Sequence, residues 1–179
     1  WIDISENGYG ISVLNNCKYG CDIHNGEIGL TMLKSAVYPN PDADKEHHSF
    51  TWSIAPHEGG WREGNTVAKA YVLNNPYQTA VKENEGGNLP ASYSFVQADK
   101  ENVVIEAVKK AEDSDAVIVR LYECYNRRGQ TTLTFPRPVK RAVICNMLEE
   151  EIGEVLNVNG SQVELELKPY EIETVKVEF

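Results

Sequence analysis

Short segments in which apolar and polar residues alternate follow one another along the chain, separated by Gly, Pro, Asn and Asp. Many of these segments are rich in β-branched and aromatic side chains, and helical periodicity is nearly absent. This pattern predicts an all-β sandwich. The clearest strand lies near the C-terminus, where Val163, Leu165 and Leu167 alternate with Glu164, Glu166 and Lys168.

Tight hairpins are predicted wherever an Asn-Gly pair separates two apolar segments. Asn and Gly accept the positive φ angles of a type I′ turn, whose twist suits two antiparallel strands. We therefore expect strands on both sides of each such pair. The pairs are Asn7-Gly8, Asn25-Gly26 and Asn159-Gly160.

Residues 101–112 allow two interpretations. Their apolar positions follow a helical spacing, and Glu106 and Lys110 form an i,i+4 pair on the opposite side. The β-branched residues Val103 and Val104 and the all-β surroundings favour a strand instead. We predict a strand here, followed by a turn at residues 113–115 and a second apolar strand at residues 116–122.

A polar, glycine-rich and acidic segment within residues 83–90 is the best candidate for a domain boundary. It separates an N-terminal block from a C-terminal block of similar length. We therefore predict two domains, residues 1–82 and residues 83–179.

The chain of 179 residues has 27 acidic and 17 basic side chains, so its formal net charge at pH 7 is −10. Because its densest basic stretches are isolated pairs, this balance argues against binding to nucleic acid. The apolar runs are far shorter than the roughly 20 residues of a transmembrane helix, so a membrane is not an expected partner either. The first residues carry no targeting segment and lie inside a patterned segment, as expected for a piece of a longer chain.

The four cysteines lack the spacing of paired zinc ligands. We therefore expect free thiols and a reducing compartment, the cytoplasm. We also expect this chain by itself to hold no cofactor. The cysteines are Cys17, Cys21, Cys124 and Cys145.

Histidines are the most obvious candidates for chemistry. His47, His48 and His57 lie near acidic residues in the sequence, which allows a metal site or an acid/base cluster. Their spacing differs from the helical H-E-x-x-H pattern, so a solvated loop is the favoured explanation. The sequence contains no nucleophile elbow and no phosphate-binding loop. Aromatic and amide side chains also allow a carbohydrate contact, among them Trp52, Trp61, Tyr77 and Asn74.

Several separate motifs follow one another along nearly the whole chain. Residues 8–22 read Gly-Tyr-Gly-Ile-Ser-Val-Leu-Asn-Asn-Cys-Lys-Tyr-Gly-Cys-Asp, and Tyr38-Pro39-x-Pro41-x-Ala43-Asp44 and Pro56-His57 come next. Residues 117–123 precede Asn126-Arg127-Arg128-Gly129, and Pro169-Tyr170-Glu171-Ile172-x-Thr174 lies near the C-terminus. In this order the motifs resemble the C-terminal β region of glycoside hydrolase family 38 α-mannosidases.

The resemblance implies a retaining α-mannosidase that binds its sugar with zinc and uses two carboxyl groups about 5–5.5 Å apart. The family holds the zinc and these groups in an N-terminal catalytic domain. That domain is the expected partner of this chain within one polypeptide, with an α-mannoside as substrate, and an oligomer is possible. No catalytic residue or zinc ligand is carried over, because no histidine here is followed two residues later by Asp.

The resemblance also implies a division of the fold. Residues 1–82 would be the end of a large β-sandwich of the galactose-mutarotase-like supersandwich type. Residues 83–179 would be a small terminal β-sandwich.

The turn at residues 16–22 is the candidate substrate contact. Lys18, Tyr19 and Asp22 match the family's pattern, whereas Asn16 replaces its usual Asp and Cys21 its usual Tyr. Asn16 keeps its hydrogen-bonding capacity but lacks the charge, so it suits positioning better than proton transfer. We expect Asn16, Lys18, Tyr19 and Asp22 to lie at the rim of the sugar cleft. The alternative is a turn that serves only packing.

These expectations favour a non-catalytic C-terminal region that supports and partly lines the cleft of an α-mannosidase. A free-standing carbohydrate-binding module is the alternative, and it predicts an exposed line of aromatic residues on one sheet face. An independent small hydrolase would need a catalytic set that the motifs do not supply. Whether this chain alone is an enzyme therefore stays open.

Overall fold

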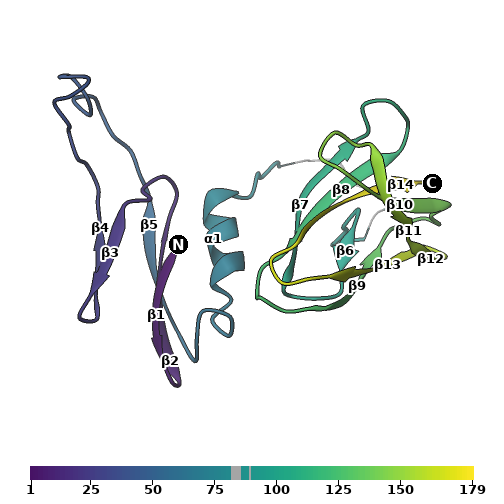
Figure 1. Cartoon of the computed structure of the whole chain (residues 1–179), viewed down its shortest axis with the longest axis horizontal. Helices are drawn as coiled ribbons and strands as arrows, with labels where there is room; N and C mark the ends of the chain where they lie inside the picture. The colour runs from purple at the N-terminus through teal and green to yellow at the C-terminus, as the bar shows by residue number, and fades with distance from the viewer. Residues whose placement is uncertain (82–85, 89) are drawn as a thin grey trace. The chain divides into compact units, whose positions relative to one another are not determined.

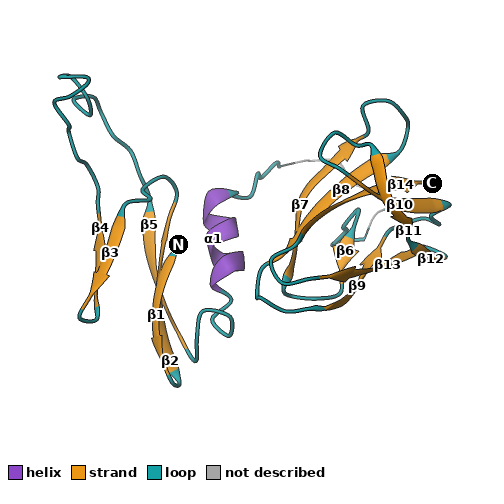
Figure 2. Ribbon diagram, viewed as in Figure 1, coloured by secondary structure: helices purple, strands orange, loops and turns teal. Residues whose placement is uncertain are grey.

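The structure of the chain is a computed structural model that describes residues 1–81, 86–88 and 90–179 (Figure 1). Strands form nearly all of the regular structure in these residues (Figure 2). The predicted all-β class is therefore confirmed. The chain divides into two compact units, Trp1–Glu83 and Asn84–Phe179. The predicted boundary between residues 82 and 83 lies outside the described residues.

The first unit is built around a three-stranded antiparallel sheet in the order β1-β2-β5. A separate hairpin, β3-β4, follows the second strand, and α1 packs on β2. The bounds are β1 (Ile2–Glu6), β2 (Tyr9–Asn15), β3 (Cys21–His24), β4 (Glu27–Leu30), β5 (Trp52–His57) and α1 (Thr66–Asn74).

Helix α1 was not predicted, because its residues form no sharp apolar stripe. Thr66 and Ala70 are its buried residues, while the apolar side chain of Val72 is 46% exposed. Contact with the sheet stabilises the helix: Asn74 Nδ2 donates to the carbonyl oxygen of Asn15 at 3.1 Å. Tertiary contacts thus decide the conformation of this segment.

All three predicted Asn-Gly hairpins are present, but they use different turns. The β3-β4 turn has positive φ at both Asn25 (51°) and Gly26 (81°), as type I′ requires. In the β1-β2 turn only Gly8 has positive φ, and only Gly160 does in the turn between β12 (Asn157–Asn159) and β13 (Gln162–Leu167). The expectation of a type I′ turn is therefore wrong at these two hairpins, where a single glycine supplies the left-handed residue.

The second unit consists of two antiparallel sheets, one in the order β11-β10-β14-β8-β7 and the other in the order β12-β13-β9-β6. Buried side chains of both sheets share one core, with Leu121 and Val175 from the first and Leu133 and Leu165 from the second. This arrangement is a β-sandwich, as predicted. The bounds are β6 (Gln97–Ala98), β7 (Val103–Lys110), β8 (Val117–Glu123), β9 (Gly129–Thr134), β10 (Arg141–Cys145), β11 (Glu151–Val155), β12 (Asn157–Asn159), β13 (Gln162–Leu167) and β14 (Ile172–Glu178).

Strand β7 confirms the prediction for residues 101–112. It pairs with β8, and the register shifts between Ile105 and Ala107. Such an irregularity adds a residue to one strand and breaks the alternation of sides. The apparent helical spacing of the apolar residues is explained by this shift.

One carboxylate is completely enclosed in the second unit. Glu123, at the end of β8, is 2% exposed. It accepts hydrogen bonds from Asn102 Nδ2 at 2.9 Å and from the backbone N–H groups of Tyr125 at 2.7 Å and Tyr170 at 3.0 Å. Burial raises the pKa of Glu123, but these donors and the Arg127 backbone outweigh it and hold the pKa below the usual value. The carboxylate therefore joins three separate connecting segments.

Among the residues with described structure, no helix combines the length and the apolar character that crossing a bilayer requires.

Candidate functional site

The turn at residues 16–22 leaves the first sheet at the end of β2. The backbone N–H of Asn16 donates to the carbonyl oxygen of Thr51 at 3.1 Å, and Asn16 Oδ1 accepts from the Thr51 N–H at 2.9 Å. Asn15 Oδ1 accepts a further bond from the backbone N–H of Lys18 at 2.8 Å. These bonds fix the first half of the turn, and they occupy the side-chain oxygen of Asn16.

The other predicted site residues differ in their surroundings. Lys18 is half-buried, with Nζ 5.1 Å from the centroid of the Phe50 ring. Tyr19 is 84% exposed. Asp22 lies opposite Gly29 in the β3-β4 hairpin and extends across it, so that a Cβ at Gly29 would be 2.5 Å from Asp22 Oδ1.

The structure places Asn16 and Lys18 beside residues 50 and 51. Within the described part of the chain, no hydrogen bond or ion pair joins any two of the four predicted residues. Their contact with a sugar remains a prediction.

Asp44 fixes the long loop that follows β4. Its Oδ2 accepts from the backbone N–H of Ser35 at 2.9 Å, and the ring of His48 donates to its carbonyl oxygen at 3.1 Å. The Ser35 bond is the main reason why the pKa of Asp44 is lowered; the backbone of Lys34 and the charges of His48 and Lys18 act in the same direction, against a desolvation effect. Lys18 and Asp44, from two different motifs of the resemblance, are thus electrostatically linked.

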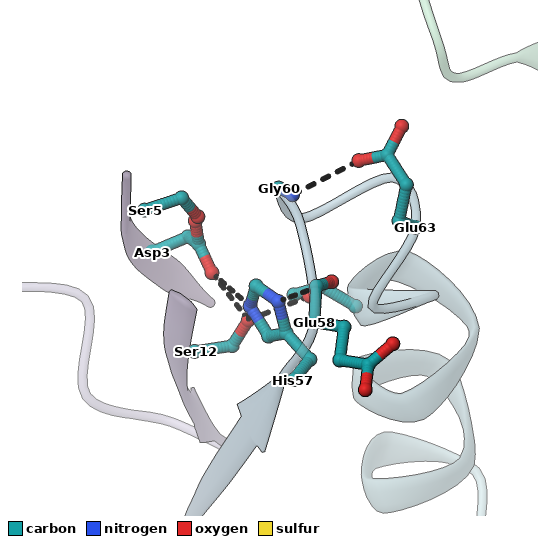
Figure 3. A network of polar contacts seen from close by, with 8 residues as sticks. Asp3, Ser5, Ser12, His57, Glu58, Gly60 and Glu63 are labelled. Carbon is teal, nitrogen blue, oxygen red and sulfur yellow. Dashed lines mark hydrogen bonds and ion pairs between the residues drawn. The ribbon is translucent and has the colours of Figure 1, made fainter. Parts of the chain in front are cut away.

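A buried polar cluster lies between the first sheet and α1 (Figure 3). His57 Nε2 donates to Asp3 Oδ2 at 2.7 Å, and the hydroxyl of Ser12 donates to the same oxygen at 2.6 Å. Ser5 donates to the other oxygen of Asp3, and the hydroxyl oxygens of Ser12 and Thr66 are 2.6 Å apart. The side chains of His57 and Asp3 are only 3% and 6% exposed. The cluster thus connects β1, β2 and β5 with the start of α1.

The charges in this cluster compensate each other. Burial raises the pKa of Asp3, but hydrogen bonds from Ser12, Ser5 and His57, with the charge of His57, hold the pKa below its usual value. His57 Nδ1 donates to the carbonyl oxygen of Glu58 at 3.3 Å. Both ring nitrogens of His57 thus face oxygen acceptors, one on the Asp3 side chain and one on the backbone.

Two glycines enclose the imidazole ring. A Cβ added at Gly10 would overlap Cε1 of His57 and lie 2.5 Å from Ser5 Oγ, and a Cβ at Gly64 would lie 2.5 Å from Cγ of His57. Real Cβ contacts essentially never fall below 3.0 Å. The glycines are therefore required by the close approach of the backbone to the ring.

Serine, histidine and aspartate here do not form a hydrolytic triad. In a triad the aspartate and the serine contact opposite ring nitrogens, whereas Asp3 and Ser12 both contact Nε2 of His57. Ser12 is 0% exposed and donates its proton to Asp3. No substrate reaches this hydroxyl, so the geometry indicates a structural role.

Sequence reasoning missed the pairing of His57 with Asp3, which lies 54 residues away. It grouped His57 with His47 and His48, whereas His48 contacts Asp44. Across the described residues, no group of three or more His, Cys, Asp or Glu side chains is arranged to hold a metal ion. Gly10, a glycine inside a strand, was the one available signal of a close approach.

Known protein families match both units. The model of the "Glycosyl hydrolases family 38 C-terminal domain" matches residues 1–42, and that of the "Glycosyl hydrolases family 38 C-terminal beta sandwich domain" matches residues 102–175. The chain belongs to the C-terminal region of glycosyl hydrolase family 38. Within this family 38 chain, Gly10, Ser12 and the turn at residues 16–22 fall in the first match, and Glu123 falls in the second.

Named relatives support this assignment. The chain is 33% identical to Alpha-mannosidase G of Dictyostelium discoideum over 98% of its own length and 16% of that protein. It is 30% identical to Alpha-mannosidase 2C1 of Homo sapiens over 96% of its length and 17% of that protein. The family 38 chain thus spans about a sixth of the length of the curated relatives it matches.

Solved structures share the fold. The crystal structure of an alpha-mannosidase from Enterococcus faecalis V583 superimposes on 97% of this chain with a TM-score of 0.76. The match covers 20% of that chain, and 18% of the aligned residues are identical. The likeness shows that this family 38 chain shares its fold with a part of that larger protein.

Proposed function

We propose that residues 1–179 are the C-terminal β region of a retaining, zinc-dependent α-mannosidase, in which they support the catalytic domain and line its cleft. The observation that carries this proposal is the similarity along almost the whole chain to proteins named alpha-mannosidases, of which it covers about a sixth. The free thiols of all four cysteines suit a reducing compartment such as the cytoplasm.

Zinc does not fit the described residues. His57 is committed at both ring nitrogens, and the described acidic, His and Cys side chains form no metal-binding group. Structural and catalytic zinc sites need at least three protein ligands. We therefore assign the zinc, the nucleophile and the acid to a part of the longer polypeptide outside this chain.

Tyr19 is the residue proposed to reach the cleft. The bonds of Asn16 and Lys18 fix the first half of the turn, and Tyr19 follows it with 84% of its surface exposed. A flat apolar ring with a hydroxyl is suited to stack on a sugar and to hydrogen-bond to it. The fixed first half of the turn also lowers the conformational entropy lost on binding.

The carbohydrate-binding module is less well supported. Tyr9 and Trp52 are both about half exposed on the open face of the first sheet. Ile11, Val13 and Ile54 lie between them in the register, so this face is mainly aliphatic. Calorimetry of the 179-residue chain with free mannosides tests the module: tight binding would favour it over the proposed role.

The test uses the longer polypeptide that contains this chain. We expect it to hydrolyse an aryl α-mannoside, to lose activity on treatment with a chelator and to regain it with zinc. Tyr19→Ala should lower kcat/KM at least tenfold with an unchanged melting temperature. Tyr170→Ala is the matched control, because Tyr170 is also exposed (56%) but lies in the second unit.

Two results would count against the proposal. Absence of α-mannosidase activity in the longer polypeptide would refute the assigned enzyme. Full activity of the Tyr19→Ala variant would refute the position of this turn at the cleft while leaving the enzyme assignment intact.

A further inference from the structure

A small pocket lies in the second unit where the β6-β7 and β8-β9 connections meet the end of β13. Its volume is about 210 Å³. Pockets that bind drug-sized molecules measure about 300–1,000 Å³, so this one suits a smaller ligand. Its polar lining includes Lys100, Asn102, Arg127, Arg128 and Gln130.

The lining of this pocket carries more positive than negative charge. Lys100 belongs to the β6-β7 connection, and Arg127 and Arg128 belong to the β8-β9 connection. Glu123 is the one carboxylate among the lining residues. The chain as a whole has a net charge of −10, so three cations around one small pocket stand out against its composition. The pocket therefore suits an anionic ligand.

Glu123 offsets these cations only in part, because its carboxylate is already occupied. It is buried and accepts hydrogen bonds from Asn102 Nδ2 and from the backbone N–H groups of Tyr125 and Tyr170. These bonds also tie the two connections together. They fix the walls of the pocket in the absence of a ligand, which lowers the entropy that binding costs.

Two of the three cations have a carboxylate partner outside the pocket. Lys100 Nζ lies 2.9 Å from Asp99 Oδ2, and Arg128 Nη1 lies 3.5 Å from Glu166 Oε1. The side chains of both pairs are 40–58% exposed. Ion pairs of such exposure contribute little to stability, so an anion in the pocket can compete with them.

Arg127 is the cation best placed for a ligand. Its side chain is exposed, and its Cζ lies 5.7 Å from the centroid of the Tyr125 ring, within the range of a cation–π contact. In the described part of the chain, its guanidinium forms no ion pair with a carboxylate. The ring thus supports the guanidinium and leaves its N–H groups available. Their planar fork matches two oxygens of a phosphate group.

We propose that this pocket binds the phosphate group of a small phosphate monoester. Arg127 binds two phosphate oxygens, and Arg128 and Lys100 compensate the charge. Leu167 and Val103, the apolar residues of the lining, contact the organic part. A free phosphate ion has the same oxygens but leaves the apolar lining uncovered. The inference goes beyond the proposed function and does not depend on it.

Isothermal calorimetry of the 179-residue chain at low salt tests the proposal with glycerol phosphate, inorganic phosphate and glycerol. We expect glycerol phosphate to bind with a Kd of about 1 mM or below. Inorganic phosphate should bind no more tightly, and glycerol should not bind. Low salt is required because ions screen contacts of this kind.

Three variants locate the site. Arg127→Gln should raise the Kd of glycerol phosphate roughly tenfold or more, and Lys100→Gln, on the other connection, about threefold or more. Arg137→Gln is the matched control, because it removes the same charge from a guanidinium that lies 4.2 Å over the Phe179 ring and outside the pocket. It should leave the Kd unchanged. Circular dichroism shows that each variant keeps its melting temperature.

Each outcome decides the proposal. Loss of binding in Arg127→Gln and Lys100→Gln with binding retained in Arg137→Gln supports it. Absence of glycerol phosphate binding to the unchanged chain would overturn it. Equal weakening by Arg127→Gln and Arg137→Gln would show a response to overall charge and would also overturn it. Binding of inorganic phosphate without glycerol phosphate would identify the free ion as the ligand and exclude the monoester.

Discussion

Gly10→Ala is the sharpest test of the buried cluster in the first unit. The added Cβ would overlap Cε1 of His57 and lie 2.5 Å from Ser5 Oγ. The ring cannot move away easily, because Gly64 lies against it and both its nitrogens are hydrogen-bonded. Gly10 has no positive φ angle, so the expected cost is steric rather than conformational.

The magnitude follows from two limits. Inserting a methyl group into a packed interior costs about 1–3 kcal/mol. Displacing His57 would in addition break its buried pair with Asp3, and losing one partner of such a pair costs about 3–5 kcal/mol. We therefore expect Gly10→Ala to lower the free energy of unfolding of the first unit by roughly 2–5 kcal/mol.

Urea unfolding followed by tryptophan fluorescence measures this loss. The chain has three tryptophans, Trp1, Trp52 and Trp61, and all lie in the first unit. With a slope of about 1–2 kcal/mol per molar urea, the midpoint should fall by at least ~1 M. Gly60→Ala is the control, because a Cβ there would meet only the end of the Glu63 side chain, at 3.2 Å.

A double variant separates the steric explanation from any other. His57→Ala removes the ring that the new methyl group would meet. In that background the new methyl group meets only the hydroxyl of Ser5, the end of a short side chain that can rotate, so Gly10→Ala should cost about 1 kcal/mol or less, and the coupling energy should be about 1 kcal/mol or more. Equal costs of Gly10→Ala with and without the ring would refute the reasoning.

Three further predictions concern single groups. The pKa of Asp3 is lower in the folded chain, so its ionised carboxylate stabilises the fold above the unfolded pKa of about 3.9, and this stabilisation is lost as the pH falls through the folded pKa. The urea midpoint of Asp3→Asn should therefore fall less in acid than that of the unchanged chain. An equal fall in both would contradict this prediction. The substitution Glu123→Gln places an amide N–H donor against the backbone N–H groups of Tyr125 and Tyr170. We expect the free energy of unfolding of the second unit, followed by circular dichroism, to fall by about 2–4 kcal/mol. The exposed Glu154→Gln is the control and should leave it unchanged. Burial raises the pKa of Cys124 to about 11 and also raises that of Cys145. N-ethylmaleimide should therefore modify only the two exposed thiols of the folded chain, and all four thiols in urea. Rapid modification of all four in buffer would contradict the burial of Cys124 and Cys145. The exposed thiols are those of Cys17 and Cys21.

Local pattern was enough to predict those strands whose two sides differ in polarity. In β13, Val163, Leu165 and Leu167 are buried and their neighbours are exposed, so alternation alone identifies the strand. The Asn-Gly pairs also identified three hairpins, because the need for a residue with positive φ is set by the turn itself. The type of turn was less predictable, because one glycine is sufficient at Gly8 and Gly160.

Features that depend on contacts between distant parts of the chain could not be predicted from the sequence. Helix α1 buries Thr66 and Ala70, and Thr66 contacts Ser12 of β2, a strand 54 residues before it in the sequence. The helix sequence itself shows no apolar stripe. The pairing of Asp3 with His57 joins residues that no spacing rule connects. Of the predicted turn, the structure gives the hydrogen bonds of Asn16 and the exposure of Tyr19. Contact of the turn with a sugar stays a prediction.

Glu123 also bears on how long the second unit stays folded. Its bond to Tyr125 is local, whereas its bonds to Asn102 and Tyr170 span 21 and 47 residues and close only after these segments have met. Contacts of such long range form late, because loop closure must come before them. Late contacts stabilise the native state more than the transition state and act mainly on the unfolding rate. We therefore expect the bonds of Glu123 to slow the unfolding of the terminal sandwich more than they speed its folding.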